Sequence, residues 1–334
     1  MMPGGFSIPG GVRTAAFLIT LAGTVICGFI AIPLLKRFHV GQTIRDDGPA
    51  THLAKSGIPT MGGVIFIVPA AIVLAVLSLW DNRIIPALLV TVGFGLVGLT
   101  DDILKVVRKS KDGLTAAQKT VGIVVFASVF STYAAFSAHI GTSILLPLTG
   151  MTAGLPIPYW IYIPFTIFVM YGTSNAVNFT DGVDGLASSV TLLVMASFTL
   201  AAAISVRDDG AAALTAAFAG GCLGFLFFNA HPARVIMGDC GSLALGGAVS
   251  AAAIVMRAHW ILLFFGIIYV AEALSVMIQI AYFKRTRKRV FKMAPIHHHF
   301  ELSGWGESRV VIVFCAVTFV FCCIGLLLMF GRVI

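Results

Sequence analysis

Charged residues are scarce in this sequence: Asp, Glu, Lys and Arg together make up only 11% of its 334 residues. Hydrophobic residues make up 58%, and the mean hydropathy is +0.99. This balance lies far outside the range of soluble proteins and predicts a polytopic membrane protein. The net charge of +8 does not indicate nucleic-acid binding, because the basic residues lie in a few loops.

The chain also lacks the cysteine patterns of disulfide-bonded and zinc proteins. Its six cysteines show no C-x-x-C spacing and mostly lie within apolar runs, which indicates buried thiols. No internal repeat is evident, and this argues against transporters built from duplicated halves. The first apolar run has no small-residue cleavage pattern, so we expect a retained span and not a signal peptide.

Ten apolar runs are long enough, or nearly so, to cross a membrane as helices. We expect an all-α fold of about ten transmembrane helices in a single integral-membrane domain, residues 1–334. Glycines weaken the signal of the third and eighth runs. The uncharged stretch 139–158 carries Gly/Pro turns and permits a small external β-hairpin. The expected spans are 14–35, 58–80, 83–100, 118–138, 159–177, 185–206, 211–229, 241–257, 259–282 and 309–331.

The basic residues are distributed unevenly between the two sides of such a bundle. All but five of the 22 lie in loops of one side, and the five are Arg13, Arg83, Arg207, Arg257 and Arg332. The positive-inside rule makes the basic side cytoplasmic and both termini extracytoplasmic. Most of the 14 acidic residues share the basic side, so we expect cytoplasmic active-site loops.

Polar residues gather most densely at 175–186, between two apolar runs. Asn175, Asn178, Asp181 and Asp184 fall within ten residues of one another, and each costs free energy at a membrane end unless it is solvated or paired. Two glycines let backbone and a ligand approach closely. We expect a ligand-binding loop, and the alternative is a polar turn between helices.

Two further polar motifs adjoin apolar runs. Asp101 and Asp102 end the third span, where adjacent carboxylates suit a divalent cation or a general base, and Lys105 one turn on can meet a phosphate. An ordinary solvated helix end would look the same. Lys55 and Thr60 open the second span and can face an anionic ligand. A plain loop-to-helix entry with Lys55 reaching the membrane interface is the alternative.

The segment between the seventh and eighth spans contains Asn229, Gly238 and Asp239. A single Asp between glycines at a helix start is a suitable magnesium ligand, because the backbone leaves room for the waters of the metal. The alternative is an N-cap of the eighth span. We favour the metal, because the other acidic loops lie on the same side.

The basic run 284–292 is typical of an anchor on anionic lipid headgroups and leads into three consecutive histidines. His297, His298 and His299 can donate hydrogen bonds to phosphates or take part in proton transfer. A histidine-rich turn without a function is the alternative. Glu272 is an intramembrane carboxylate and by default a functional candidate. A structural hydrogen bond to a neighbouring span explains it equally well, so we place it outside the site.

Taken together and in this order, the motifs resemble the phospho-N-acetylmuramoyl-pentapeptide transferase family, within the polyprenyl-phosphate N-acetylhexosamine-1-phosphate transferases. The histidine segment discriminates most, since relatives that use other sugar nucleotides differ there. Ser56 and Ile58 stand in a segment that often reads GTPTMGG. The resemblance spans nearly the whole chain and rests on KSGIPTMGG (55–63), DDILK (101–105), NAVNFTDGVDGL (175–186), MGDCGSLALGG (237–247) and PIHHHFELSGW (295–305).

The resemblance implies transfer of phospho-MurNAc-pentapeptide from UDP-MurNAc-pentapeptide to undecaprenyl phosphate, with Mg²⁺, giving lipid I and UMP. It implies a multi-pass homodimer in the inner membrane of a bacterium. Asp239 would bind Mg²⁺, and Asp101, assisted by Asp102, would take the proton of the lipid phosphate or position it. His297 would complete the catalytic set. The substrate-binding residues would be Lys55, Thr60, Lys105, Lys119, Asn175, Asn178, Asp181, Asp184, Gly185, Leu186, Asn229, Gly238, Gln279, His298 and His299.

Direct attack by the lipid phosphate is the expected route, because that phosphate is already a competent anionic nucleophile. A two-step path through a covalent aspartyl-phosphosugar enzyme is the alternative. Among other functions, a related UDP-GlcNAc:polyprenyl-phosphate GlcNAc-1-phosphate transferase comes first. An intramembrane prenyltransferase would show two aspartate-rich motifs on helices. A secondary transporter would place its polar residues near mid-membrane in broken helices.

Overall fold

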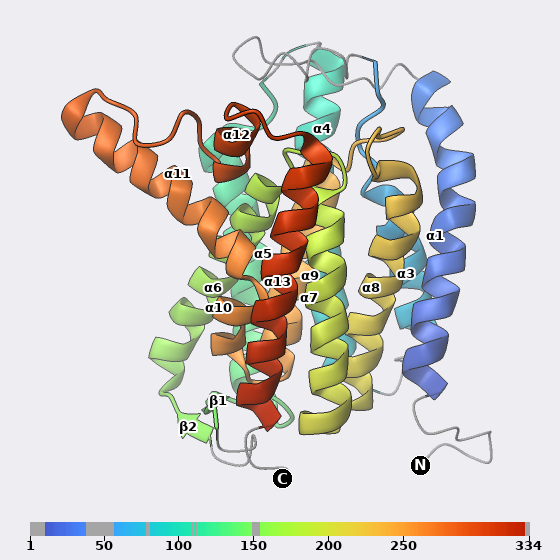
Figure 1. Cartoon of the computed structure of the whole chain (residues 1–334). Helices are drawn as coiled ribbons and strands as arrows, with labels where there is room; N and C mark the ends of the chain where they lie inside the picture. The colour runs from blue at the N-terminus through green and yellow to red at the C-terminus, as the bar shows by residue number, and fades with distance from the viewer. Residues whose placement is uncertain are drawn as a thin grey trace.

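The computed structural model describes residues 11–37, 57–77, 81–108, 110, 112–148 and 154–330, and it confirms a helical, polytopic membrane protein. The helices form one bundle, from which α11 tilts away (Figure 1). They are α1 (Gly11–Arg37), α3 (Val64–Leu77), α4 (Ile84–Arg108), α5 (Ala116–Phe136), α6 (Tyr159–Thr180), α7 (Leu186–Ala201), α8 (Asp209–Asn229), α9 (Gly238–Val255), α10 (Leu262–Phe265), α11 (Ile267–Thr286), α12 (Ile296–Glu301) and α13 (Glu307–Phe330).

All ten predicted spans correspond to helices of the described chain. Eight of these helices are long and apolar enough to cross a membrane, with α7 counted together with the π-helical turn Ala202–Val206 that extends it. Of the other two, α6 has 22 residues, and α3 has 14 in the part of the chain that the structure describes.

Two predicted spans differ from the structure in their course. Residues 58–63 are not helical but irregular, with a turn at 62–63: the N–H groups of Gly62 and Gly63 donate to the carbonyls of Ile236 and Met237, both at 2.9 Å. The glycine and proline residues of this segment disfavour a helix, and the 236–237 backbone satisfies its polar groups instead. The predicted helix 259–282 breaks at Gly266, where α10 ends and the outward-tilting α11 begins (Figure 1).

The glycines that weaken the third and eighth spans serve close packing between α4 and α9. Together with α8, these are the most buried of the eight candidate spans, with 61% and 89% of their most apolar windows buried. A Cβ on Gly98 would lie 2.1 Å from the carbonyl oxygen of Asp239, and a Cβ on Gly247 would lie 3.1 Å from the ring of Phe94. Small residues of this kind let membrane helices approach closely, so the two helices position their polar ends against each other.

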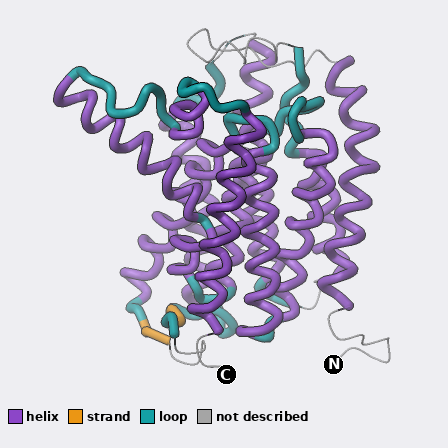
Figure 2. Tube along the Cα trace, in the orientation of Figure 1, coloured by secondary structure: helices purple, strands orange, loops and turns teal. Residues whose placement is uncertain are grey.

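The two ends of the bundle differ. The predicted hairpin is confirmed: strands β1 (Ser143–Leu145) and β2 (Gly154–Pro156) pair antiparallel at one end, the hairpin end, where α1 begins and α13 ends (Figure 1). Longer loop segments lie at the opposite end (Figure 2). That end, the site end, gathers the end of α4 and the start of α9, and the predicted motifs that the structure describes lie there.

One arginine holds helix starts together at the hairpin end. Arg83, just before α4, lies 2.7 Å from Asp81 and 2.6 Å from Asp208, which caps the N-terminus of α8 through the N–H of Ala211. Burial acts to raise the pKa of Asp81, but the hydrogen bonds and charge of Arg83 outweigh it, and the pKa is lowered. The same pairing raises the pKa of Arg83. This cluster is a closed ion-pair network.

Candidate active site

Three aspartates from two helices meet at the site end. Asp101 and Asp102 lie near the C-terminal end of α4, and Asp239 lies in the first turn of α9. One carboxylate oxygen from each lies within 4.8 Å of the others. The close approach of α4 to α9 at Gly98 makes this possible, because any side chain at that position would collide with the backbone of Asp239.

Two lysines place their ammonium groups between these carboxylates. Lys119 Nζ lies 2.5 Å from Asp239 Oδ2 and 3.5 Å from Asp101 Oδ2. Lys105 Nζ lies 2.5 Å from Asp101 Oδ2 and 3.2 Å from Asp239 Oδ2. A capping box that begins with Thr115 fixes the start of α5 and thereby the position of Lys119. Three carboxylates against two ammonium groups leave one net negative charge in this carboxylate–lysine cluster.

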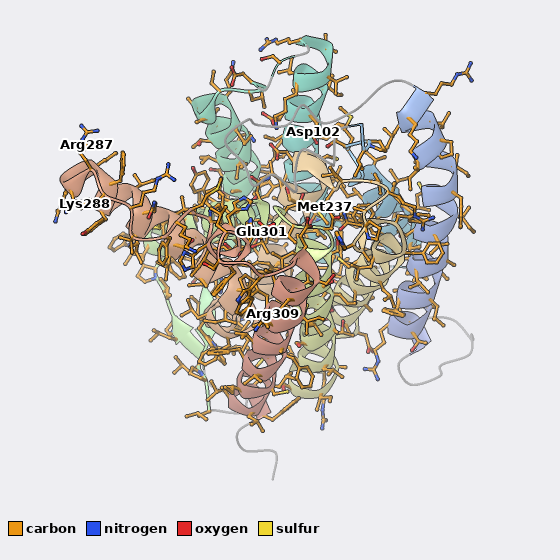
Figure 3. The ribbon with its side chains drawn as sticks, turned by 45° about the horizontal axis from the view of Figure 1, so that its top comes forward. Asp102, Met237, Arg287, Lys288, Glu301 and Arg309 are labelled. Atoms are coloured by element: carbon orange, nitrogen blue, oxygen red, sulfur yellow. The ribbon has the colours of Figure 1, made fainter. Side chains whose placement is uncertain are left out.

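Asp102 is held by the backbone that leads into α9. Its Oδ2 accepts a hydrogen bond from the N–H of Cys240 at 3.0 Å. Gly238 has a φ of +73°, and a Cβ there would lie 2.6 Å from Asp102 Oδ2 and 2.9 Å from Thr60 Oγ1. Only glycine fits this position. Figure 3 shows Asp102 and Met237 at the site end of the bundle. Gly238 and Thr60 therefore pack beside the Asp102 carboxylate at that end.

Asn178 reaches the same cluster from α6. Its Nδ2 donates to Asp239 Oδ1 at 2.9 Å and to Ser242 Oγ at 2.7 Å. The side chain of Asp239 is 18% exposed, whereas those of Asp101 and Asp102 are 2% and 4% exposed. Asp239 is therefore the carboxylate that a ligand reaches most readily.

The loop between α6 and α7 is tied to two other segments. Asp184 Oδ2 accepts the N–H of Ala233 at 3.0 Å and lies 3.1 Å from His231 Nδ1. The N–H of Asp184 donates to Glu307 Oε2, in the first turn of α13, at 3.2 Å. Gly185, with a φ of +74°, starts α7. The loop 181–185 is thus fixed between the end of α8 and the start of α13.

Two more of the predicted binding residues lie at the two ends of this loop. Asp181 ends α6, and its N–H donates to the carbonyl of Asn178 at 3.2 Å. Leu186 opens α7 and is fully buried. Both therefore shape the loop between α6 and α7.

The histidine segment folds as the short helix α12 against this loop. His297 is fully buried, and its Nδ1 lies 3.0 Å from Oε1 of Glu272 on α11. A Cβ on Gly182 would lie 2.1 Å from His297 Nε2, so the imidazole contacts the 181–185 loop directly. His298 Nδ1 lies 2.7 Å from Glu301 Oε2.

Four predicted binding residues have their side chains engaged by the protein's own backbone or side chains. The amide of Asn229 bonds Ser188 and the carbonyl of Val235, and that of Asn175 donates to the carbonyl of Tyr171. Gln279 accepts the N–H groups of Val290 and Phe291, and His299 accepts that of Lys292, so the 290–292 segment is held against α11 and α12. These contacts do not join the carboxylate–lysine cluster. Lys55 lies outside the described residues.

The structure adds residues that the sequence reasoning left out of the site. Glu272 contacts His297, and its signal was its position as a lone carboxylate within a predicted span. His231 and Glu307 meet Asp184, and the backbone N–H of Leu114 donates to Asp101 Oδ1 at 2.8 Å. No local pattern predicts these contacts, because each joins different secondary-structure elements or loops.

In the described chain, three groups of His, Asp and Glu residues bring their ligand atoms close enough to hold a metal ion. They are Asp101, Asp102 and Asp239; Asp184, His231 and Glu307; and His297, His298 and Glu301. Only the first consists of carboxylates alone, and Mg²⁺ prefers oxygen ligands. The donor set of the carboxylate–lysine cluster therefore fits Mg²⁺, with Asp239 its most accessible member.

Comparison with known proteins identifies the family of the chain. The family model of glycosyl transferase family 4 matches residues 84–257, and the phospho-N-acetylmuramoyl-pentapeptide-transferase signature 1 matches residues 55–67. Proteins with the name phospho-N-acetylmuramoyl-pentapeptide-transferase are similar over nearly their full length. The one from Acetivibrio thermocellus is 52% identical over 310 residues, which cover 92% of this chain and 93% of the relative. That from Clostridium kluyveri is 48% identical over 317 residues, with 95% and 97% covered. The chain therefore belongs to the phospho-N-acetylmuramoyl-pentapeptide-transferase family.

Proposed function

We propose that this protein transfers phospho-MurNAc-pentapeptide from UDP-MurNAc-pentapeptide to undecaprenyl phosphate, which gives lipid I and UMP. The names of its relatives support this transfer. The observation that carries the proposal is the cluster of Asp101, Asp102, Asp239, Lys105 and Lys119 at one end of a membrane bundle. A water-soluble diphosphate donor and a lipid-linked phosphate can meet only at the membrane surface, and this cluster lies at an end of the bundle.

The site end is proposed to face the cytoplasm of a bacterium. The sequence assigns all but five of the 22 basic residues to one side of the bundle, and Lys105, Lys119 and Arg309 of that set lie at this end in the described chain. The positive-inside rule then orients the bundle. UDP-linked sugars are made in the cytoplasm, so this orientation brings donor and site into one compartment. The homodimer stays a prediction.

The reaction requires the protein to align the two substrates and to neutralise their negative charge. Phosphoryl transfer needs little covalent help, because charge develops on oxygens that fixed donors and cations stabilise. An oxygen of undecaprenyl phosphate would attack the phosphorus that bears the sugar. The bond from that phosphorus to the bridging oxygen would break, and UMP would leave with that oxygen and its electron pair.

We assign the residues of the carboxylate–lysine cluster to this direct route. Lys105 and Lys119 would turn from the carboxylates to the phosphates of the two substrates, since a lysine ammonium group is a point charge on a flexible stem. Asp101, almost fully buried beside Lys105, would position the acceptor phosphate or take its proton, with Asp102 assisting. His297 and the 181–185 loop would contact the donor.

Mg²⁺ is the proposed cofactor, and the residues that would hold it are Asp239 and, beside it, Asp101 and Asp102. When bound, it would neutralise the negative charge of the diphosphate. Asn178 donates to the second oxygen of Asp239 and thereby keeps the carboxylate oriented toward the cluster. This support from a neighbouring amide is typical of metal-binding carboxylates.

The test is transfer to undecaprenyl phosphate by the purified protein in detergent, with UDP-MurNAc-pentapeptide or UDP-N-acetylglucosamine as the donor. Each donor is assayed with and without Mg²⁺, beside Asp239→Ala. We expect UMP release with the muramoyl donor alone, dependent on Mg²⁺ and abolished in the variant. Arg207→Met, an exposed change at the hairpin end, is the matched control and should keep full activity.

Other outcomes decide between the competing functions. Activity with UDP-N-acetylglucosamine would overturn the proposed donor and indicate the related GlcNAc-1-phosphate transferase. UMP release from neither donor, by protein shown to be folded, would overturn the transferase. Labelled phosphosugar trapped on the protein in the absence of lipid acceptor would replace direct attack by the two-step route.

A further inference from the structure

Glu272 is a buried glutamate that contacts His297, the histidine packed against the 181–185 loop. Glu272 and His297 are both fully buried, and Glu272 Oε1 lies 3.0 Å from His297 Nδ1. Glu272 comes from α11, a helix of which only 22% of the most apolar window is buried. A carboxyl group within a membrane span costs free energy unless a polar partner compensates for it, and its partner here is the His297 imidazole.

The contact leaves one ring nitrogen of His297 for other partners. Nε2 is buried and has no hydrogen-bond partner among the described residues, and it points at Gly182 in the 181–185 loop. Any side chain at position 182 would occupy the space of the imidazole, since a Cβ there would lie 2.1 Å from Nε2. The glycine thus keeps this nitrogen against the loop that we assign to the donor.

We infer that Glu272 is a positioning residue for His297: its carboxylate holds the proton on Nδ1 and keeps Nε2 against the 181–185 loop, which we assign to the donor. This inference rests on the proposed function for the identity of the donor. The hydrogen bond at one imidazole nitrogen decides which nitrogen carries the proton and which faces a ligand. With Nδ1 committed to Glu272, the ring cannot rotate to exchange its two nitrogens.

A purely structural role for Glu272, such as anchoring α11 to the bundle, predicts different behaviour. Ser275 lies on the same helix close to Glu272, is buried, and donates to the carbonyl of Glu272 at 2.7 Å without contacting His297. A change at Ser275 disturbs the packing of α11 but leaves the imidazole held. Ser275→Ala is therefore the matched control for variants of Glu272.

The activity test is a double-mutant cycle in the full-length protein. We expect Glu272→Met, which keeps the size of the side chain but removes the acceptor, to lower kcat about 10- to 100-fold, the range seen when the partner of a ligating histidine is lost. Glu272→Gln, which retains an acceptor oxygen, should recover part of this loss, and Ser275→Ala should be unchanged. In a His297→Gln background, Glu272→Met should cost nothing further.

A second pair of variants approaches the imidazole from the other side. Gly182→Ala should displace His297 and lower kcat as Glu272→Met does. Gly172→Ala, on the exposed surface of α6 with no atom within 4 Å of the added Cβ, should be unchanged. Equal losses in Gly182→Ala and Gly172→Ala would contradict a specific contact with His297.

A spectroscopic measurement separates this inference from the proposed function. In protein labelled with ¹⁵N-histidine, the resonance lost in His297→Gln should report a proton on Nδ1 in the wild type, and Glu272→Met should abolish that preference. This result stands whether or not UMP is released. An unchanged ¹⁵N spectrum in Glu272→Met, or losses that add fully in the double variant, would overturn the positioning role.

Discussion

The two ends of the bundle each carry a cluster of acidic and basic side chains, but they are built from different cations. At the hairpin end, Arg83 bonds Asp81 and Asp208 at once, with four side-chain hydrogen bonds of 2.6–3.0 Å. At the site end, Lys105 and Lys119 stand among three aspartates. Each cluster has one carboxylate more than it has cations, but the first fixes its two carboxylates on one rigid guanidinium, and the second holds its three on two ammonium groups with flexible stems.

The difference separates a structural cluster from a functional one. A planar guanidinium matches carboxylates in fixed directions, so Arg83 ties the start of α4 to that of α8 in a fixed geometry. A lysine ammonium group can leave one oxygen for another at small cost, so Lys105 and Lys119 can exchange carboxylates for phosphates. We therefore expect changes at the hairpin end to alter stability and changes at the site end to alter turnover.

The largest effect is expected from Lys119→Met. Lys119 Nζ lies 2.5 Å from Asp239 Oδ2, and we expect a loss of about 10²- to 10³-fold in kcat, as when an oxyanion hole loses one preorganised donor. The net charge of the carboxylate–lysine cluster would change from one negative charge to two. Mg²⁺ should therefore bind more tightly to the variant while UMP release falls, which calorimetric titration with Mg²⁺ and the transfer assay measure together.

The informative result of the Lys119 experiment is that Mg²⁺ affinity and turnover change in opposite directions. A variant that had merely lost its local fold would lose both Mg²⁺ binding and turnover. Lys288→Met is the matched control, because Lys288 lies just beyond the end of α11, away from Asp102 (Figure 3). Weaker Mg²⁺ binding in folded Lys119→Met would contradict the assignment of this cluster to the metal.

Much of the site was predictable because its residues carry their own local signal. Asp101, Asp102 and Asp239 are carboxylates at the ends of apolar runs, where a stability role is costly, and they converge in the structure. The helices were predictable for a related reason, since a membrane span needs a long apolar run. The alternation of loop charge then indicated which ends lie together.

Sequence patterns did not predict the contacts that depend on the fold as a whole. Nothing near residue 272 indicates that its carboxylate meets His297, because the contact depends on the tilt that α11 takes after Gly266. The irregular segment 58–63 is apolar enough for a helix, but its backbone pairs with residues 236–237, far along the chain. Asn229 has the residue type of a ligand-binding group, but its amide holds the turn after α8.

A smaller effect, on stability alone, is expected from Arg83→Met. It leaves Asp81 and Asp208 without their cation, and the side chains are 23% and 7% exposed. Breaking a fully buried ion pair costs several kcal/mol and an exposed one less than about 1, so we expect a loss of about 1–3 kcal/mol for this half-buried network. The melting temperature in detergent should fall, and activity per folded molecule should stay at the wild-type level.

The control for Arg83 is again Arg207→Met, since Arg207 is exposed at the same end. It should melt as the wild type does. A loss of turnover in folded Arg83→Met as large as that in Lys119→Met would erase the distinction between the two clusters.

The smallest effect concerns stability at acid pH and tests the same distinction between the two clusters. Arg83 lowers the pKa of Asp81 below its ordinary value of 3.8, so the folded state binds this proton less readily than the unfolded chain does. A carboxyl with a lowered pKa contributes stability that is complete above its unfolded pKa and is lost as the pH falls through the folded one. Wild-type protein should therefore lose stability below about pH 4, and Asp81→Asn should lose less over that range, because it has no charge there to neutralise. Melting temperatures of both proteins between about pH 6 and pH 3 measure the difference. Parallel curves would show that the ion pair of Arg83 with Asp81 adds no stability and that only its pair with Asp208 does.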